Sequence, residues 1–295
     1  MFFNRLPNRC ERLNVFKEIN EKYKSIETGV LAKSILSSEI HYYKIGCGRR
    51  NIISVGAHHG MEHITSAVLY NIIEKMGDFL TRDRAAYGTN IPFLLQKFTF
   101  WFIPCLNPDG VDISLFEKPP SPLCERILQM NGGENLKLWQ ANARGVDLNH
   151  NYDFRFAEYK IIETENGILP GRTRFSGEDP ESEAETRALA NLVRVIAPDL
   201  ILSFHTQGEE VYVRPRGSEK ASRIGKICAK ILEYELSLPT GLADYGGLSD
   251  YAGEILGITS LTVELGKGEN PLPYSLLQSI FERVFKLDCL MPNYL

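Results

Sequence analysis

Residues 52–63 read IISVGAHHGMEH, an apolar run that leads without a break into histidines and a glutamate. The run IISVGA (52–57) is short and contains β-branched residues, so it predicts a buried strand. In open α/β sheets, ligands collect where the strands end, which is where His59 and Glu62 would lie. The stretch therefore indicates an α/β protein with a functional site at the end of this strand.

Strands and helices are predicted to alternate along the rest of the chain. Helices are expected at 11–24, 64–76, 181–196, 219–233 and 272–289, and further strands at 40–45, 96–104, 199–204 and 259–265. This alternation predicts a single-domain mixed α/β fold with a largely parallel sheet and helices on both faces. We expect one catalytic domain over residues 1–295, with residues 1–37 as an N-terminal helical segment packed on it.

Two stretches are predicted to be irregular. The segment LNPDGVD (106–112) contains proline and glycine and is interpreted as a loop. Residues 115–178 are polar and interrupted by glycine and proline, which is typical of a functional loop region within a compact domain.

The composition of the 295-residue chain is that of an ordinary globular protein, with 24% charged residues and a formal net charge of −4. This charge does not favour binding to nucleic acid or to an anionic membrane. No apolar run is long enough for a signal peptide or a membrane span, so we expect a cytoplasmic protein.

The six cysteines lack a CxxC spacing, which predicts free thiols. The oligomeric state is not indicated by the sequence.

Three predicted strands carry ionisable side chains at or near their ends. His59 and Glu62 follow one strand, His205 follows another, and Glu264 lies within a third. Two histidines and a carboxylate suit Zn²⁺ and leave a fourth position for water. We therefore predict that His59, Glu62 and His205 bind one zinc ion. Glu264 is predicted to be the catalytic base, because a glutamate in an apolar strand requires a partner or a function.

A second metal-site pattern fits the same stretch. His59, Glu62 and His63 match HxxEH, in which both histidines bind zinc from one helix and the glutamate is the base. That pattern requires a continuous helix through Gly60, and a glycine in a helix interior is destabilising. It also requires a distant glutamate on another helix as the third ligand. The region near Glu134 is not expected to be helical. We therefore favour the strand-end set and assign no ligand role to the remaining histidines.

Five sequence blocks, in order, resemble the zinc carboxypeptidases of the M14 type over about residues 38–275. The blocks are GAHHGMEHIT (56–65), PCLNPDGVD (104–112), NARGVDLNHNYD (142–153), LSFHTQGEE (202–210) and LTVELGKGENPLP (261–273). Within the family, the chain is most similar to bacterial γ-D-glutamyl-meso-diaminopimelate peptidases, which cut peptidoglycan stem peptides. The stretch FSGEDPESEAETRAL (175–189) also contributes to that similarity.

The resemblance implies roles for residues of the third block. Arg144 falls where the family has a cation that stabilises the oxyanion. Asn149 matches a substrate-binding asparagine. His150 departs from the family, which usually has an arginine there that grips the terminal carboxylate of the substrate. Because a neutral histidine grips a carboxylate less well, this departure favours cleavage within a short muropeptide over strict release of a C-terminal residue.

The loop LADYGGLSDY (242–251) is expected to line the substrate pocket. Tyr245 is the nearest candidate for the proton-donating tyrosine of the family. Asp250 is a candidate to meet the ammonium group of a diamino acid; the alternative is an aspartate that caps a turn. Arg172 and Arg174 are either solvated loop residues or cations that face an acidic substrate.

Three functions follow as hypotheses. The first is a zinc-dependent peptidase that hydrolyses the γ-D-glutamyl to meso-diaminopimelate amide bond of peptidoglycan stem peptides, so that the expected partner is a peptide or muropeptide. The second is a general metallocarboxypeptidase that releases C-terminal residues from L-peptides, which His150 disfavours. The third is a catalytically inactive muropeptide-binding protein, which the complete metal set and Glu264 disfavour.

Overall fold

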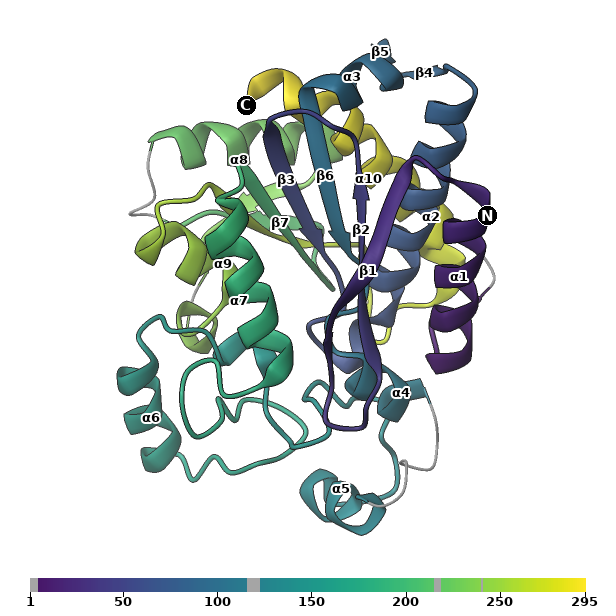
Figure 1. The fold of residues 1–295 in the computed structure, drawn as a ribbon. Helices are drawn as coiled ribbons and strands as arrows, with labels where there is room; N and C mark the ends of the chain where they lie inside the picture. Colours follow the sequence, from purple (N-terminus) through teal and green to yellow (C-terminus); the bar gives the residue numbers. More distant parts are fainter. Residues whose placement is uncertain (1–4, 116–122, 215–218, 240) are drawn as a thin grey trace.

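The structure is a computed structural model that describes residues 5–115, 123–214, 219–239 and 241–295. It is a single mixed α/β domain, in which helices cover both faces of a central sheet (Figure 1). The strands of the described residues are β1 (Ile26–Lys33), β2 (Glu39–Ile45), β3 (Arg50–Val55), β4 (Ala85–Ala86), β5 (Thr89–Asn90), β6 (Phe98–Ile103), β7 (Leu200–His205), β8 (Glu210–Tyr212), β9 (Glu235–Ser237) and β10 (Ser260–Glu264).

The helices accompany these strands as follows. They are α1 (Arg9–Lys22), α2 (His63–Thr81), α3 (Ile91–Lys97), α4 (Pro108–Leu115), α5 (Cys124–Asn131), α6 (Phe156–Glu165), α7 (Ala184–Ile196), α8 (Glu219–Leu232), α9 (Leu248–Asp250) and α10 (Leu277–Leu290). Short 3-10 turns are η1 (Gly60–Glu62), η2 (Leu148–His150), η3 (Gly241–Asp244), η5 (Tyr274–Leu276) and η6 (Met291–Tyr294), and η4 (Tyr251–Ile255) is a π-helical turn.

The central sheet has the strand order β1-β2-β6-β3-β7-β10-β8-β9 among the described residues. The four strands β6, β3, β7 and β10 are parallel to one another. At one edge β1 and β2 are antiparallel, and on the other side β8 is antiparallel to β10. The predicted fold class, a mixed and largely parallel sheet covered on both faces, is confirmed.

Alternate residues of the central strands face two hydrophobic cores. On β7, Leu202 and Phe204 pack into a core shared with α1, α2, α8 and α10, whereas Ile201 packs into a core shared with α7 and α9. Figure 1 shows α2 and α7 on opposite sides of the sheet. Because both faces of these strands are buried, they consist of nearly continuous apolar runs.

The N-terminal segment differs in part from the prediction. Helix α1 packs on the domain as expected, with Val15 and Ile19 buried in the larger core. The prediction that residues 1–37 form a helical segment is wrong for residues 26–33, which form β1 and pair with β2. As an edge strand, β1 buries few of its residues fully, so its sequence lacks a clear alternation of apolar and polar positions.

Two predicted loops contain helices. The segment interpreted as a loop at 106–112 enters α4, which begins at Pro108. Proline is compatible with this first position of a helix, because an N–H group there would have no hydrogen-bond partner within the helix. The stretch 115–178 contains α5, α6 and the short η2, connected by irregular segments. Residues 116–122 of that stretch lie outside the described residues.

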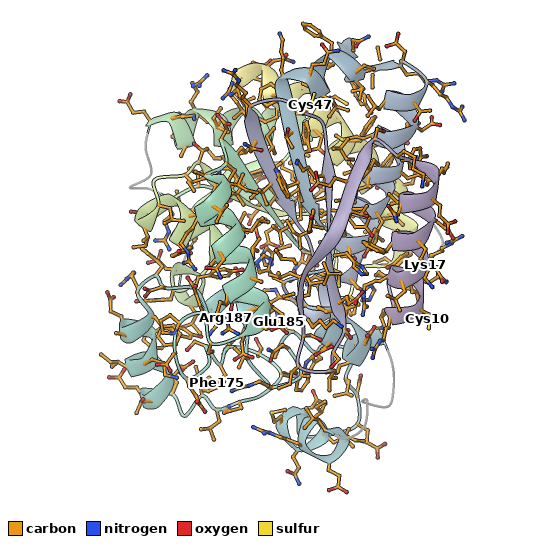
Figure 2. The ribbon with its side chains drawn as sticks, in the orientation of Figure 1. Cys10, Lys17, Cys47, Phe175, Glu185 and Arg187 are labelled. Atoms are coloured by element: carbon orange, nitrogen blue, oxygen red, sulfur yellow. The ribbon has the colours of Figure 1, made fainter. Side chains whose placement is uncertain are left out.

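All six cysteines are free thiols, as predicted. Cys10 and Cys47 are exposed and lie in separate parts of the surface (Figure 2). In the described ranges, no helix combines the length and apolar character that crossing a membrane requires.

Candidate metal centre

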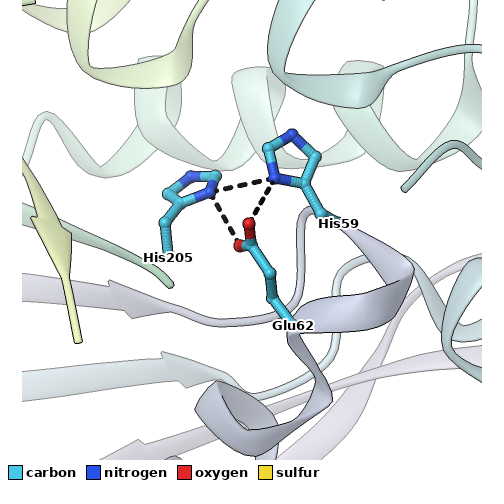
Figure 3. A group of neighbouring side chains, drawn as sticks. All are labelled: His59, Glu62 and His205. Atoms are coloured by element: carbon cyan, nitrogen blue, oxygen red, sulfur yellow. Dashed lines mark hydrogen bonds and ion pairs between the residues drawn. The ribbon is translucent and has the colours of Figure 1, made fainter. Parts of the chain in front are cut away.

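Three side chains converge at the carboxyl ends of the central parallel strands. His59 and Glu62 come from the turn between β3 and α2, and His205 is the last residue of β7. Figure 3 shows the three side chains pointing toward one another. Glu62 Oε1 lies 2.9 Å from His59 Nδ1, and Glu62 Oε2 lies 3.0 Å from His205 Nδ1. The two Nδ1 atoms are 3.3 Å apart.

These donor atoms fit one zinc ion. One ligand atom from each residue lies within 4.8 Å of the others. Ligand atoms arranged tetrahedrally about zinc at roughly 2.1 Å are about 3.4 Å from one another, close to the observed separations. Two imidazole nitrogens and one carboxylate oxygen also leave a coordination position for water. The structure thus brings together the three residues predicted to bind the metal.

The histidines are oriented by hydrogen bonds on their other ring nitrogens. His59 Nε2 lies 3.1 Å from Asp147 Oδ1, and His205 Nε2 lies 3.2 Å from Ser203 Oγ. Such partners direct the remaining nitrogen of each ring toward the metal. Asp147 was missed as a functional residue, although it lies in the block 142–153. A metal-binding histidine generally needs a carboxylate or carbonyl partner on its other ring nitrogen. A search for such a partner of His59 could have identified Asp147.

The structure excludes the HxxEH alternative. Residues 60–62 form η1, and α2 begins only at His63, so His59 and His63 do not share a helix. The ring of His63 instead stacks on Tyr274, with Nδ1 3.3 Å from the tyrosine hydroxyl oxygen. Gly60 is required in this turn, because a Cβ there would lie 2.2 Å from the carbonyl oxygen of Gly110.

Glu264 lies next to the three candidate ligands. It is the last residue of β10 and pairs with His205 in the parallel register of β10 and β7. The side chain is partly buried. Burial raises the pKa of Glu264 well above its usual value, and the nearby Glu62 carboxylate raises it further.

The carboxylates that contact the histidines are held in the charged form. Burial opposes ionisation of Glu62, but the charges of His59 and His205 outweigh it and lower the pKa of Glu62 to about 2. Burial likewise opposes ionisation of Asp147, and the charge of His59 outweighs it, so the pKa of Asp147 is lowered. A buried carboxylate that stays ionised is suited to support a cation.

Arg144 and Asn149 lie in different surroundings. Nε of Arg144 is 3.6 Å from Glu183 Oε2, and 41% of the arginine side chain is exposed. Within the described residues, no hydrogen bond or ion pair joins Arg144 to the three candidate ligands. Asn149 lines a cavity together with Glu264 and accepts a hydrogen bond from the backbone N–H of Leu248 at 3.2 Å.

His150 and Tyr245 contact each other. His150 Nδ1 lies 2.8 Å from the carbonyl oxygen of Tyr245, and the imidazole stacks on Tyr159 with ring centroids 4.5 Å apart. The hydroxyl of Tyr245 lies 3.3 Å from Nη2 of Arg155. The hydroxyl of Tyr245 therefore has an arginine partner in this conformation.

Asp250 lines the same cavity as Asn149 and Glu264. Its Oδ1 forms an ion pair with Nε of Arg214, whose side chain is 15% exposed. Arg214 was not identified from the sequence, because it follows β8, a strand of three residues that has no clear pattern. The pairing also shows that Asp250 contacts a charged side chain rather than only capping a turn.

The fold and the three converging side chains define an α/β protein with a candidate site for one zinc ion. The protein-family model described as zinc carboxypeptidase matches residues 13–286. The chain is 28% identical over 275 residues to gamma-D-glutamyl-L-diamino acid endopeptidase 1 of Lysinibacillus sphaericus, covering 92% of this chain and 68% of that protein. It is 30% identical over 165 residues to murein peptide amidase A of Escherichia coli (strain K12), covering 54% and 55% of the two chains.

A solved structure shares the fold over the full length. The structure of bovine thrombin-activatable fibrinolysis inhibitor in complex with tick carboxypeptidase inhibitor aligns with a TM-score of 0.76 at 17% identity, covering 100% of this chain and 98% of that chain. The chain therefore belongs to the zinc carboxypeptidase family of metallopeptidases. The predicted family and zinc cofactor are confirmed.

Proposed function

We propose that this protein hydrolyses the amide bond between the γ-carboxyl group of D-glutamate and a diamino acid in peptidoglycan stem peptides. The observation that carries the proposal is the convergence of His59, Glu62 and His205 beside Glu264 and a cavity that contains Asp250. A carboxylate in that cavity suits a substrate with an amino group beyond the cleaved bond. The name of the Lysinibacillus sphaericus relative describes this reaction for that protein.

The residues of this chain have defined roles in the proposed reaction. His59, Glu62 and His205 would hold the zinc ion, which would supply an acidified water and polarise the scissile carbonyl. Glu264 accepts a proton as water attacks and delivers it to the leaving nitrogen, so the amide C–N bond breaks and a carboxylate and an amine form. Asn149 orients the substrate from the wall of the cavity, and Asp250 faces the amino group of the diamino acid.

Other residues would assist substrate binding and charge stabilisation. Arg144 stabilises negative charge on the carbonyl oxygen in this proposal, which requires its side chain to leave Glu183. His150 contributes to binding in place of a carboxylate-gripping arginine, and Tyr245 is the candidate proton donor. The proposal includes a cytoplasmic location, since free thiols are typical of a reducing compartment.

The test is mass spectrometry of an L-Ala-γ-D-Glu-diaminopimelate tripeptide after incubation with the zinc-loaded protein. The reaction is run beside the Glu264→Gln variant and beside an ordinary L-peptide. Cleavage between D-Glu and the diamino acid that the variant does not perform supports the proposal. Activity on the L-peptide alone, with release of its C-terminal residue, would contradict the proposal and would indicate a general carboxypeptidase.

A further inference from the structure

The cavity beside Glu264 has charged groups of both signs in its wall. It encloses about 140 Å³ between the end of β10, the residue that follows β8 and the α9–η4 segment. Arg214, Asp250 and Glu254 line it together with Asn149 and Glu264. Since Glu264 is the proposed base, a substrate side chain that enters this cavity belongs to the residue next to the cleaved bond.

The guanidinium of Arg214 is held in a fixed position. Nη1 pairs with Asp244 Oδ1 at 2.7 Å, Nη2 donates to the carbonyl oxygen of Asp244 at 3.0 Å, and Nε pairs with Asp250. The group also lies 4.5 Å from the ring centroid of Phe154. These contacts use three of the five N–H groups of an arginine, so two N–H groups of Arg214 have no partner among the described residues and can donate to a ligand in the cavity.

Three acidic groups and two arginines lie in this region. Asp244 pairs with both Arg155 and Arg214, and Asp250 pairs with Arg214. Glu254 is exposed and forms no ion pair within the residues that the structure describes. Glu254 lies on the π-helical turn η4, and such turns are frequent at functional sites. The exposed carboxylate of Glu254 favours a cation, while the guanidinium of Arg214 favours a carboxylate.

We infer that this cavity binds the end of the substrate side chain as a zwitterion, with its ammonium group on Asp250 and Glu254 and its carboxylate on Arg214. The inference rests on the proposed function and makes it more specific. A diamino acid whose side chain ends in both an amino and a carboxyl group, such as meso-diaminopimelate, is then preferred over lysine, whose side chain ends in an amino group alone.

The experiment uses four tripeptides that differ only at the end of this side chain. The zinc-loaded protein is given L-Ala-γ-D-Glu joined to meso-diaminopimelate (ammonium and carboxylate), lysine (ammonium only), 2-aminopimelate (carboxylate only) or norleucine (neither). The value of kcat/KM is measured for each. Because hydrogen bonds to charged groups are stronger than those between neutral groups, we expect each charged group to raise kcat/KM by about tenfold or more.

Two variants assign the effects to residues. Arg214→Gln is expected to remove the advantage of diaminopimelate over lysine, and Glu254→Gln is expected to reduce the advantage of lysine over norleucine. Arg214→Gln leaves Asp250 without its arginine, whereas Asp244 keeps its ion pair with Arg155. The pair Arg214→Gln with Asp250→Asn therefore restores the charge balance and serves if the single variant fails to fold. The matched control is Arg82→Gln, at the exposed residue that follows α2, which loses only a surface ion pair with Asp78.

The outcomes distinguish failure of the zwitterion site from failure of the proposed function. Cleavage of all four tripeptides at similar rates would overturn the zwitterion site while leaving γ-D-glutamyl peptidase activity intact. A preference for diaminopimelate that survives both Arg214 variants would also overturn it. Cleavage of none of the four would overturn the proposed function, and this inference with it.

Discussion

Glu264 lies directly opposite His205, at the ends of the adjacent parallel strands β10 and β7. Paired residues of a parallel ladder point to the same face of the sheet, and neighbouring strands lie about 4.8 Å apart. The sheet itself therefore sets the distance between the proposed base and a candidate zinc ligand. Placement on a rigid central strand fixes the backbone position of Glu264.

The proposed base can be tested separately from metal binding. Glu264→Gln keeps the size of the side chain but removes the proton acceptor, so we expect kcat to fall by about 100-fold to 10,000-fold with zinc content unchanged. Steady-state kinetics and metal analysis of the same samples provide the measurement. The exposed Glu233→Gln should match wild type in both. Loss of zinc from the Glu264 variant would contradict the assignment as a base and would indicate a role in metal binding.

Asp147 is predicted to support zinc binding through His59. Asp147→Asn keeps the shape but removes the negative charge that faces His59 Nε2, and we expect zinc affinity to fall by about 10-fold to 100-fold. Competition with a chromogenic chelator measures this affinity. Asp153→Asn, an exposed site a few residues away, is the control. An unchanged zinc affinity in the Asp147 variant would show that this hydrogen bond does not contribute to zinc binding.

Gly60 is predicted to be necessary for the shape of the metal-binding turn. Gly60→Ala would place a Cβ 2.2 Å from the backbone oxygen of Gly110, so the turn or α4 must shift. We expect a loss of about 1–3 kcal/mol in the free energy of unfolding, together with weaker zinc binding. Urea denaturation with and without zinc tests both effects. Gly133→Ala meets no atom within 4 Å and should leave both unchanged.

Glu185 is predicted to make stability depend on pH. It is buried at the start of α7 (Figure 2), and its Oε1 has no hydrogen-bond partner among the residues that the structure describes. Burial raises the pKa of Glu185 from 4.5 to about 8. The folded protein therefore binds this proton more tightly than the unfolded chain. The contribution to stability is complete below pH 4.5 and is lost as the pH rises toward about 8.

The variant Glu185→Gln retains the uncharged form at every pH. Between about pH 5 and pH 9, the free energy of unfolding should fall in wild type by up to about 5 kcal/mol more than in the variant. Urea denaturation across this range measures the difference, with the exposed Glu165→Gln as control. Burial also raises the pKa of Asp288, so some loss of stability persists in the variant. If the free energy of unfolding changes with pH equally in the wild type and in the Glu185 variant, the prediction is contradicted.

Part of this architecture could be predicted because it depends on local sequence. The runs IISVGA and DLILSF are apolar on both faces, as buried parallel strands must be, and each precedes a candidate ligand. The edge strand β1 was not predicted, since its pairing with β2 depends on a partner rather than on its own pattern. Helix α4 was not predicted, because proline was interpreted as a breaker and not as a first helical residue.

The sequence by itself determined the class of this protein: the α/β alternation, the family and the residue types that suit zinc. The tertiary structure alone decided which side chains meet. His59 and Asp147 are separated by 88 residues, and Arg214 and Asp250 by 36, yet each pair is in contact. Such contacts arise from the packing of segments that are far apart in the sequence, and neither hydrophobic periodicity nor local spacing contains that information.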